Sequence, residues 1–288
     1  MEPLESNDEE FTGYAINDED ISAVANESVD FDFESMPMRG DVPAKYDPRT
    51  IPWRVENQGR VGRCAGMAAS SVGEMCFNRQ SAGQKIIHFN GHCSYIWAQK
   101  NSRGLYGRDA GSTIHGNVMA AKQKGFCPID WNGDGTPDYP LPPRYTTNIP
   151  AEAEVHAAKY KIGYSAFLET FDACLAFLQS GQGSIMCGGS WGRWSPTPNE
   201  GIADRFRSGG SGHAWMICGW DCSRDKFGED LLIAVNSHGE RSWKKGFCFL
   251  TRRFVKDFSE HKHTVIAGMS DLSDPEPRKI NWEADLVW

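Results

Sequence analysis

The stretch of sequence that decides the fold is NQGRVGRCA, residues Asn57–Ala65. It sets Gln58 six residues before Cys64, through a glycine-containing turn that leads into small and apolar residues. A thiol nucleophile and an amide that stabilises an oxyanion would be arranged in this way, because the sulfur attacks a carbonyl while the amide N–H binds the negative oxygen. The stretch therefore predicts thiol chemistry.

The residues after Cys64 predict a buried helix that runs to about Arg79. Small or apolar side chains recur there at steps of three and four residues, at Met67, Ala68, Val72, Met75 and Cys76. Cys64 then lies in the first turn, where the helix N-terminus favours a thiolate, and a neighbouring imidazolium would favour it further.

Two later segments supply the remaining groups of such a site. GHAWM, from Gly212, puts His213 at the head of a strand-like run, and AVNSHG, from Ala234, puts Asn236 where another strand ends. Taken alone, His213 is typical of a buried structural histidine and Asn236 of a turn residue. With Gln58 and Cys64, however, they resemble the Gln, Cys, His and Asn sites of the papain-like cysteine peptidases.

The resemblance continues in the same order from about Val42 to about Arg253. It includes VPAKYDPR at residues 42–49, DAGS at residues 109–112 and SWKKGF at residues 242–247. It implies an α+β fold of two lobes, one helical and one antiparallel and β-barrel-like, with the active site in a cleft between them. It also implies that Gly111 and Gly212 contact the substrate backbone.

The resemblance assigns a role to each reacting residue. Cys64 is the nucleophile, and His213 is the base that later protonates the leaving amine. Asn236 accepts the second ring proton of His213 and orients the ring, while Gln58 and the Cys64 backbone N–H stabilise the oxyanion.

Three positions depart from the family pattern. The family usually has a disulfide cysteine and a tryptophan where this chain has Val61 and Ala65. His238 replaces the tryptophan that shields the histidine–asparagine contact from water, so either Trp243 or Trp215 supplies the shield or the shield is weaker. None of these changes removes a reacting group.

Further elements follow from hydrophobic periodicity and helix-stop signals. We predict helical segments near Ser94–Gln99, at Ser112–Lys124 with Gly125 as the stop signal, and at Phe171–Ser180. The predicted strands are Ser184–Cys187, His213–Trp220, Leu231–Val235 and Gly246–Leu250, and the polar residues Asp221–Asp230 form a hairpin loop.

Composition favours a globular protein without a membrane span. The chain has 288 residues, of which 40% are hydrophobic, and has no run of 18 apolar residues. The first residues, MEPLESNDEE, lack the basic start and apolar stretch of a secretory signal, so we expect a cytoplasmic protein. For the same reason we expect most of the nine cysteines to be reduced.

Acidic charge is concentrated in the first forty residues. Residues 1–40 contain 12 acidic side chains and the single basic residue Arg39, so the total charge of −8 leaves +3 for the rest of the chain. We divide the chain into this arm, a peptidase domain at residues 41–270 and a tail at residues 271–288. Apolar residues alternate with the acidic ones, so the arm either docks in the groove and inhibits in cis, docks on a partner, or remains a solvated tail.

The residues Asp130–Asp138 match the first nine positions of a calcium loop, but position twelve is Leu141 and not the glutamate that closes such a site. We therefore interpret this segment as a polar turn and expect neither a metal nor a cofactor.

Peptide-bond hydrolysis is the function that these features predict, with a peptide or protein substrate and neither a nucleic-acid nor a membrane partner. Two alternatives stay open. The same residues can pass an acyl group to an amine, which makes the protein a transferase, or the chain can be a structural or binding protein that retains the fold.

Overall fold

The computed structural model describes residues 15, 42–50, 54–80, 87–181, 183–191, 196–197, 201–209, 211–225 and 227–270. The predicted tail at residues 271–288 lies outside them, as does the acidic arm except for Ala15. The helices of the described residues are η2 (Pro48–Thr50), α2 (Cys64–Gln80), α3 (Gly91–Lys100), α4 (Ile114–Gln123), α5 (Ala151–Ala157), α6 (Phe171–Gln179) and α7 (Arg252–Ser259). The strands are β1 (Lys45–Tyr46), β2 (Tyr164–Phe167), β3 (Gly183–Trp191), β4 (Ile202–Ala203), β5 (Ser211–Asp221), β6 (Leu231–Val235), β7 (Phe247–Leu250) and β8 (Val265–Ser270).

One sheet contains all the described strands. Its order is β2-β8-β3-β5-β6-β7-β4, and β1 pairs with β5 outside this path. All the pairs are antiparallel except β4 with β7. The long strands β3 and β5 lie in the middle of the sheet, and β5 is the strand that presents His213.

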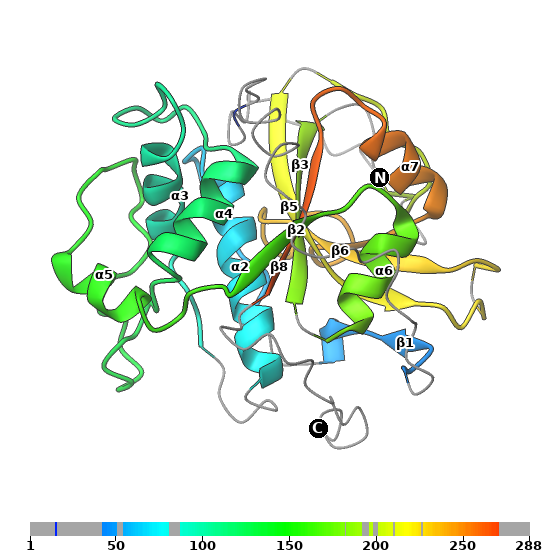
Figure 1. Ribbon diagram of the computed structural model, residues 1–288, viewed down its shortest axis with the longest axis horizontal. Coiled ribbons are helices and arrows are strands. Elements are labelled where there is room, and N and C mark those ends of the chain that lie inside the picture. The colour runs from blue at the N-terminus through cyan, green and yellow to red at the C-terminus, as the bar shows by residue number, and fades with distance from the viewer. Residues whose placement is uncertain are drawn as a thin grey trace.

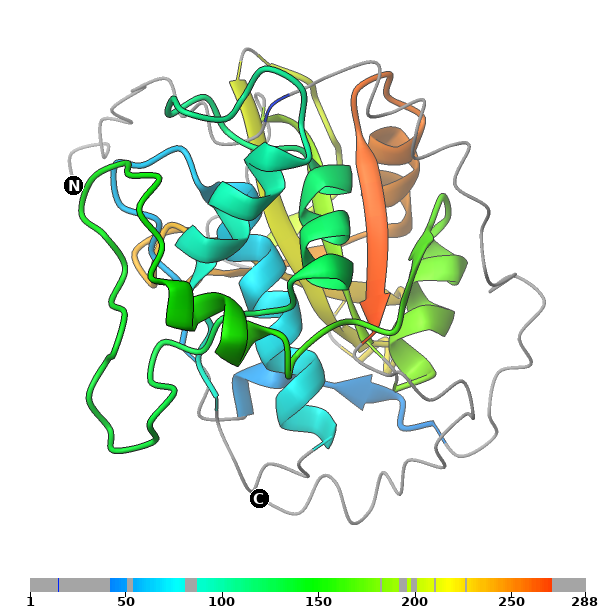
Figure 2. The same cartoon turned by 60° about the vertical axis from the view of Figure 1, so that its left-hand side comes forward.

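The helices cover the sheet on two sides (Figure 1). Turning the molecule shows α2 between the sheet and the outer helices α3 and α4 (Figure 2). One hydrophobic core lies between the sheet and α2, and another lies between the sheet and helices α6 and α7. Residues of β5 alternate between these two cores, because successive side chains of a strand point to opposite faces. Ala214 and Met216 pack in the α2 core, whereas Trp215 and Ile217 pack with α6 and α7. The predicted α+β architecture, a helical part beside a mostly antiparallel sheet, is confirmed.

The predicted helix at Cys64 is confirmed, and α2 runs to Gln80. Gly66 allows α2 to meet α3, because a Cβ at this position would collide with the carbonyl oxygen of Gly91. Gly125 follows the end of α4 with a φ of +87°, a conformation that glycine adopts without steric cost, and its N–H bonds to the carbonyl of Ala120.

Several elements differ from the sequence-based prediction. The segment predicted near Ser94–Gln99 is a longer helix, because the side chain of Asn90 accepts from the N–H of His92 and caps the helix start. Helices α5 and α7 and strands β2 and β8 were not predicted. Thr251 caps α7, and its three buried residues Phe254, Val255 and Phe258 hold it against the sheet.

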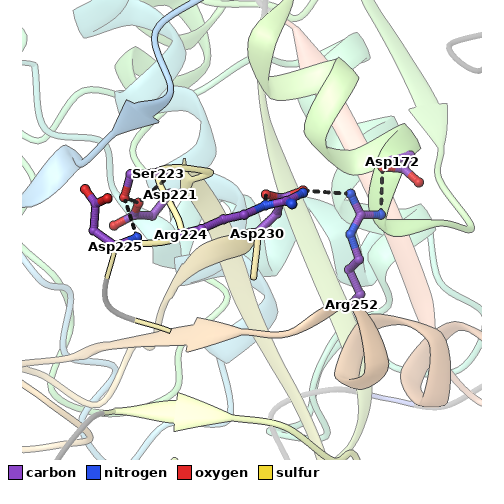
Figure 3. Close-up of polar contacts among 7 residues, drawn as sticks. All are labelled: Asp172, Asp221, Ser223, Arg224, Asp225, Asp230 and Arg252. Carbon is purple, nitrogen blue, oxygen red and sulfur yellow. Dashed lines mark hydrogen bonds and ion pairs between the residues drawn. The ribbon is translucent and has the colours of Figure 1, made fainter. Parts of the chain in front are cut away.

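The hairpin loop between β5 and β6 is tied to two helices by an ion-pair network (Figure 3). The carboxylate of Asp230 binds Arg224 at 2.8 Å and Arg252 at 3.1 Å, and Arg252 binds Asp172 on α6 at 2.8 Å. The Arg252 guanidinium also lies 4.3 Å from the ring centre of Phe171. This network joins the β5–β6 hairpin, which positions the candidate site, to α6 and α7.

Within the described part of the chain, none of the helices has the length and apolar character needed to cross a membrane.

Candidate active site

Helix α2 brings Cys64 to the strand that contains His213. Cys64 is the first residue of α2, and the helix packs along β5. The backbone N–H of Ala214, the residue after His213, lies close enough to the Cys64 thiol to lower its pKa, as do the N–H groups of Ala65 and of Cys64 itself. The nucleophile predicted from sequence therefore lies at a helix N-terminus and beside the residue that follows the predicted base.

His213 and Asn236 contact each other directly. The Nε2 atom of His213 lies 2.8 Å from the Oδ1 atom of Asn236, and both side chains are buried. Strand β6 ends at Val235, and the backbone N–H of Asn236 donates to the carbonyl of Gly246. The end of β6 thus fixes the position of Asn236 beside the ring of His213.

Gln58 is joined to the residue that follows Asn236. Its backbone N–H donates to the carbonyl of Ser237 at 2.8 Å, and the hydroxyl of Ser237 donates to the Gln58 Oε1 atom at 2.8 Å. The Gln58 amide nitrogen then faces the turn before α2, where it lies 3.3 Å from the carbonyl of Val61. The Val61 carbonyl can only accept, so it fixes which end of the Gln58 amide is the hydrogen-bond donor, and the Ser237 hydroxyl complements that orientation.

Burial controls the protonation of the site. Cys64 has 0% and His213 has 1% of its surface exposed. Burial raises the pKa of the Cys64 thiol to about 12, although the three backbone N–H groups lower it in part. Burial also lowers the pKa of His213 well below its usual value, and the neighbouring His238 lowers it further. Burial therefore opposes the charged form of each residue taken singly, and it works against the thiolate that the helix N-terminus favours.

The two predicted substrate-binding glycines lie in different surroundings. Gly212 is buried on β5 and pairs with Ser190 of β3. The N–H of Gly111 donates to the Tyr95 hydroxyl at 3.2 Å, and its carbonyl accepts from Gln99 at 2.8 Å.

The carbonyl of Ser112, the next residue on this strip, has a different partner. It accepts a hydrogen bond of 3.2 Å from the backbone N–H of Ala15, the described residue of the acidic arm. A backbone contact thus joins the arm to the strip that the sequence assigns to substrate binding.

The ring that covers the His213–Asn236 contact belongs to His238. Its centre lies 4.5 Å from that of His213, whereas the centre of the Trp215 ring lies 6.4 Å away. Trp243 packs instead against the core that contains α6 and α7. The His238 ring is therefore closer to the His213 ring than the Trp215 ring is.

Other candidate ligands in the chain are engaged in structural roles. All nine cysteines are free thiols. In the predicted polar turn, the carboxylate of Asp130 accepts from the backbone N–H groups of Gly133 and Gly135, and Asp138 accepts from those of Trp131 and Asn132. Among the residues that the structure describes, no group of three or more His, Cys, Asp or Glu side chains is placed to hold a metal ion.

Sequence reasoning missed the roles of Ser237, Tyr95 and Gln99. Ser237 follows Asn236 directly, so its place in the motif was a usable signal. Tyr95 and Gln99 lie one helical turn apart on α3, and only the folded structure shows that both reach Gly111.

Comparison with known proteins places the fold. No family model matches the sequence, and no curated protein does. Among solved structures, the chain is similar to xylellain, a cysteine protease from Xylella fastidiosa, with a TM-score of 0.61 and 19% identity over 94% of this chain and 100% of the other. The chain has the papain-like cysteine protease fold.

Two further papain-like neighbours match over most of their length. The ragweed pollen allergen Amb a 11, a cysteine protease in its proform, has a TM-score of 0.61 and 18% identity over 91% of this chain and 75% of that one. Bromelain from Ananas comosus has a TM-score of 0.57 and 15% identity over 80% of this chain and 99% of that one. At these identities the similarity establishes the papain-like fold, and the chemistry has to be argued from the side chains.

Proposed function

We propose that this protein is a cysteine peptidase that hydrolyses peptide bonds through Cys64, His213 and Asn236. One observation carries the proposal: the His213 ring lies 2.8 Å from Asn236, while the Cys64 thiol lies close enough to the backbone N–H of Ala214, the residue after His213, for that group to lower its pKa. The papain-like neighbours are cysteine proteases, which supports the same chemistry.

Each step of the reaction uses a group with a defined position. His213 takes the thiol proton as the Cys64 sulfur attacks the peptide carbonyl, and the resulting ion pair balances two charges that would be costly singly in a buried site. The Gln58 amide and the Cys64 backbone N–H stabilise the oxyanion. His213 then protonates the leaving amine, which gives a thioester. Water, deprotonated by His213, releases the carboxylic acid and restores the thiol.

Product analysis tests hydrolysis against acyl transfer. A peptide library is incubated with the protein, with and without added hydroxylamine or a primary amine, and the products are identified by mass spectrometry. We expect free carboxyl termini without the amine and no product in a Cys64→Ser variant. Amide products that dominate at low amine concentration would favour a transferase, and a protein that stays inert as the chain beginning at Gly40 would favour the non-catalytic alternative.

We also propose that the acidic arm occupies the substrate strip in cis. The hydrogen bond from Ala15 to Ser112 supports this proposal. A tethered segment has a high effective concentration, on the order of millimolar, so even a weak contact competes with substrate. Removing the arm admits water to the thiol, which lowers its pKa from the value of about 12 that burial imposes.

A chain that begins at Gly40 is expected to hydrolyse peptides at least about tenfold faster than the full chain, because the tethered competitor is gone. Within the full chain, Ala15→Pro removes the N–H that binds Ser112, whereas Ala15→Gly keeps it and serves as the matched control. Activation by Ala15→Pro but not by Ala15→Gly supports occupation in cis. Equal rates for all four proteins, with equal inhibitor affinity, rule it out and leave docking on a partner or a solvated arm.

A further inference from the structure

His238 lies beside His213, just after the end of β6. On β5 and β6, Met216 pairs with Val235 and Ile217 pairs with Ala234. The chain continues from the end of β6 through Asn236 and Ser237, and it brings the ring of His238 to within 4.5 Å of the ring of His213, measured between their centres. The chain 237–239 is held there by segment 56–58, through a bridge between Asn57 and His238 and a hydrogen bond from Gly239 to Glu56.

A neighbouring backbone group identifies which atom of the Asn236 amide is the oxygen. The N–H of Ser237 lies 2.7 Å from the Asn236 Oδ1 atom, and a backbone N–H can only donate. The atom that it meets is therefore the amide oxygen. Since this oxygen also contacts His213 Nε2, the histidine must have its proton on Nε2, which leaves Nδ1 as the basic nitrogen.

The other end of the same amide constrains His238. The Asn236 Nδ2 atom lies 3.3 Å from His238 Nδ1. An amide NH₂ donates, so His238 Nδ1 has to accept and its proton is on Nε2. Adding a second proton to His238 would set two donors against each other and would release the Asn236 amide.

The two imidazole rings also interact directly. Their centres are 4.5 Å apart and their planes are inclined by 33°. Burial lowers the pKa of His238 to about 4, so the ring is neutral at neutral pH. A positive charge on His238 would oppose the formation of an imidazolium at His213, because like charges in contact disfavour each other.

Titratable groups lie on three parts of the chain around His238. The first part contains His213 on β5 and Cys64 on α2. On the paired segment, Glu56 is buried and accepts from Arg54 at 2.8 Å. The loop that follows His238 contributes four charged residues, all of them exposed: Glu240, Arg241, Lys244 and Lys245.

We propose that His238 is a positioning residue: in its neutral form it holds the Asn236 amide, and through it the Nε2–H tautomer of His213, and it releases both when it is protonated. The effect that we expect His238 to have on activity rests on the proposed function. The structural part of the inference, the two tautomers, does not depend on turnover. A tryptophan at this position, as in the family pattern, can cover the contact but cannot accept from Asn236 and cannot titrate.

Two variants of the full chain separate the role of His238 as a hydrogen-bond acceptor from its ability to take up a proton. In His238→Asn the side-chain oxygen replaces Nδ1 as the acceptor but does not ionise, whereas His238→Leu removes the acceptor. We expect kcat to fall about tenfold in His238→Leu with little change in KM, and to stay near wild type in His238→Asn at pH 7. On the acid side, log kcat/KM should fall with a slope of about two in the wild type and about one in His238→Asn, because one of two protonations is lost.

Nitrogen NMR of the imidazole groups provides a readout that needs no substrate. In the wild type we expect the Nε2–H tautomer for both His213 and His238 at pH 7. In His238→Leu the His213 signals should report mixed tautomers, and His238→Asn should restore a single one. An Nδ1–H tautomer of His213 in the wild type, or a His238→Leu variant with unchanged tautomer, kcat and pH profile, would overturn the inference. If the wild-type protein shows the expected tautomers but the chain that begins at Gly40 cleaves no peptide, the proposed function alone is refuted.

Discussion

Replacing His213 with alanine is expected to lower kcat/KM for a peptide substrate by about 10³-fold or more, because general acid–base catalysis alone contributes up to about 10⁴-fold. The variant also loses the partner that would take the proton of a thiol whose pKa burial raises to about 12. Steady-state hydrolysis of a fluorogenic peptide by the chain that begins at Gly40 gives the ratio.

His156 offers a matched control for this variant. It is a half-buried histidine on α5 that stacks on Trp131, on the helical side of the molecule. We expect His156→Ala to keep the wild-type rate. If kcat/KM of His213→Ala fell by less than about threefold, His213 would have no direct part in the reaction.

Gln58→Ala is expected to lower kcat by about 10²- to 10³-fold, the effect of losing one oxyanion-hole donor, with a much smaller change in KM. The effect should appear mainly in kcat because the amide stabilises charge that develops only in the transition state. The Ser237 hydroxyl, which donates to Gln58 at 2.8 Å, complements the orientation of the amide that this role requires.

Gln123→Ala, an exposed glutamine near the end of α4, is the control for a general effect of losing an amide. Circular dichroism of both variants should match the wild type, since otherwise the loss reports misfolding. Were Gln58→Ala to raise KM and leave kcat unchanged, Gln58 would be a binding residue and the oxyanion would need another donor.

Much of the fold was readable because its signals are local. The helix at Cys64 was predicted closely from apolar residues at steps of three and four, and the strand Leu231–Val235 from an apolar run that follows the polar hairpin residues. Strand β8 was missed because VIAGMS is a short apolar run, and such a run does not distinguish a buried strand from a helix segment. Helix α7 was missed although Thr251 and the spacing of its apolar residues were visible, because charged residues dominate its sequence.

The candidate site was readable as a set of residues but not as a set of contacts. Motif order brought Gln58, Cys64, His213 and Asn236 together. The contact between the His238 and His213 rings could not be predicted, because it depends on the path that the chain takes after β6 ends at Val235. The effect of burial on the Cys64 thiol could not be read from the sequence, because a helix N-terminus is visible there whereas the depth of burial is not.

The reactivity of one sulfur among nine tests the account most directly. The full chain and the chain from Gly40 are treated with iodoacetamide between pH 5 and pH 8, and the modified cysteines are identified by peptide mapping. The account predicts that Cys64 of the shortened chain is alkylated selectively near pH 6, at a rate that falls to that of the other eight cysteines in His213→Ala. Slow labelling of Cys64, no faster than that of the other cysteines and unaffected by His213→Ala, would contradict it.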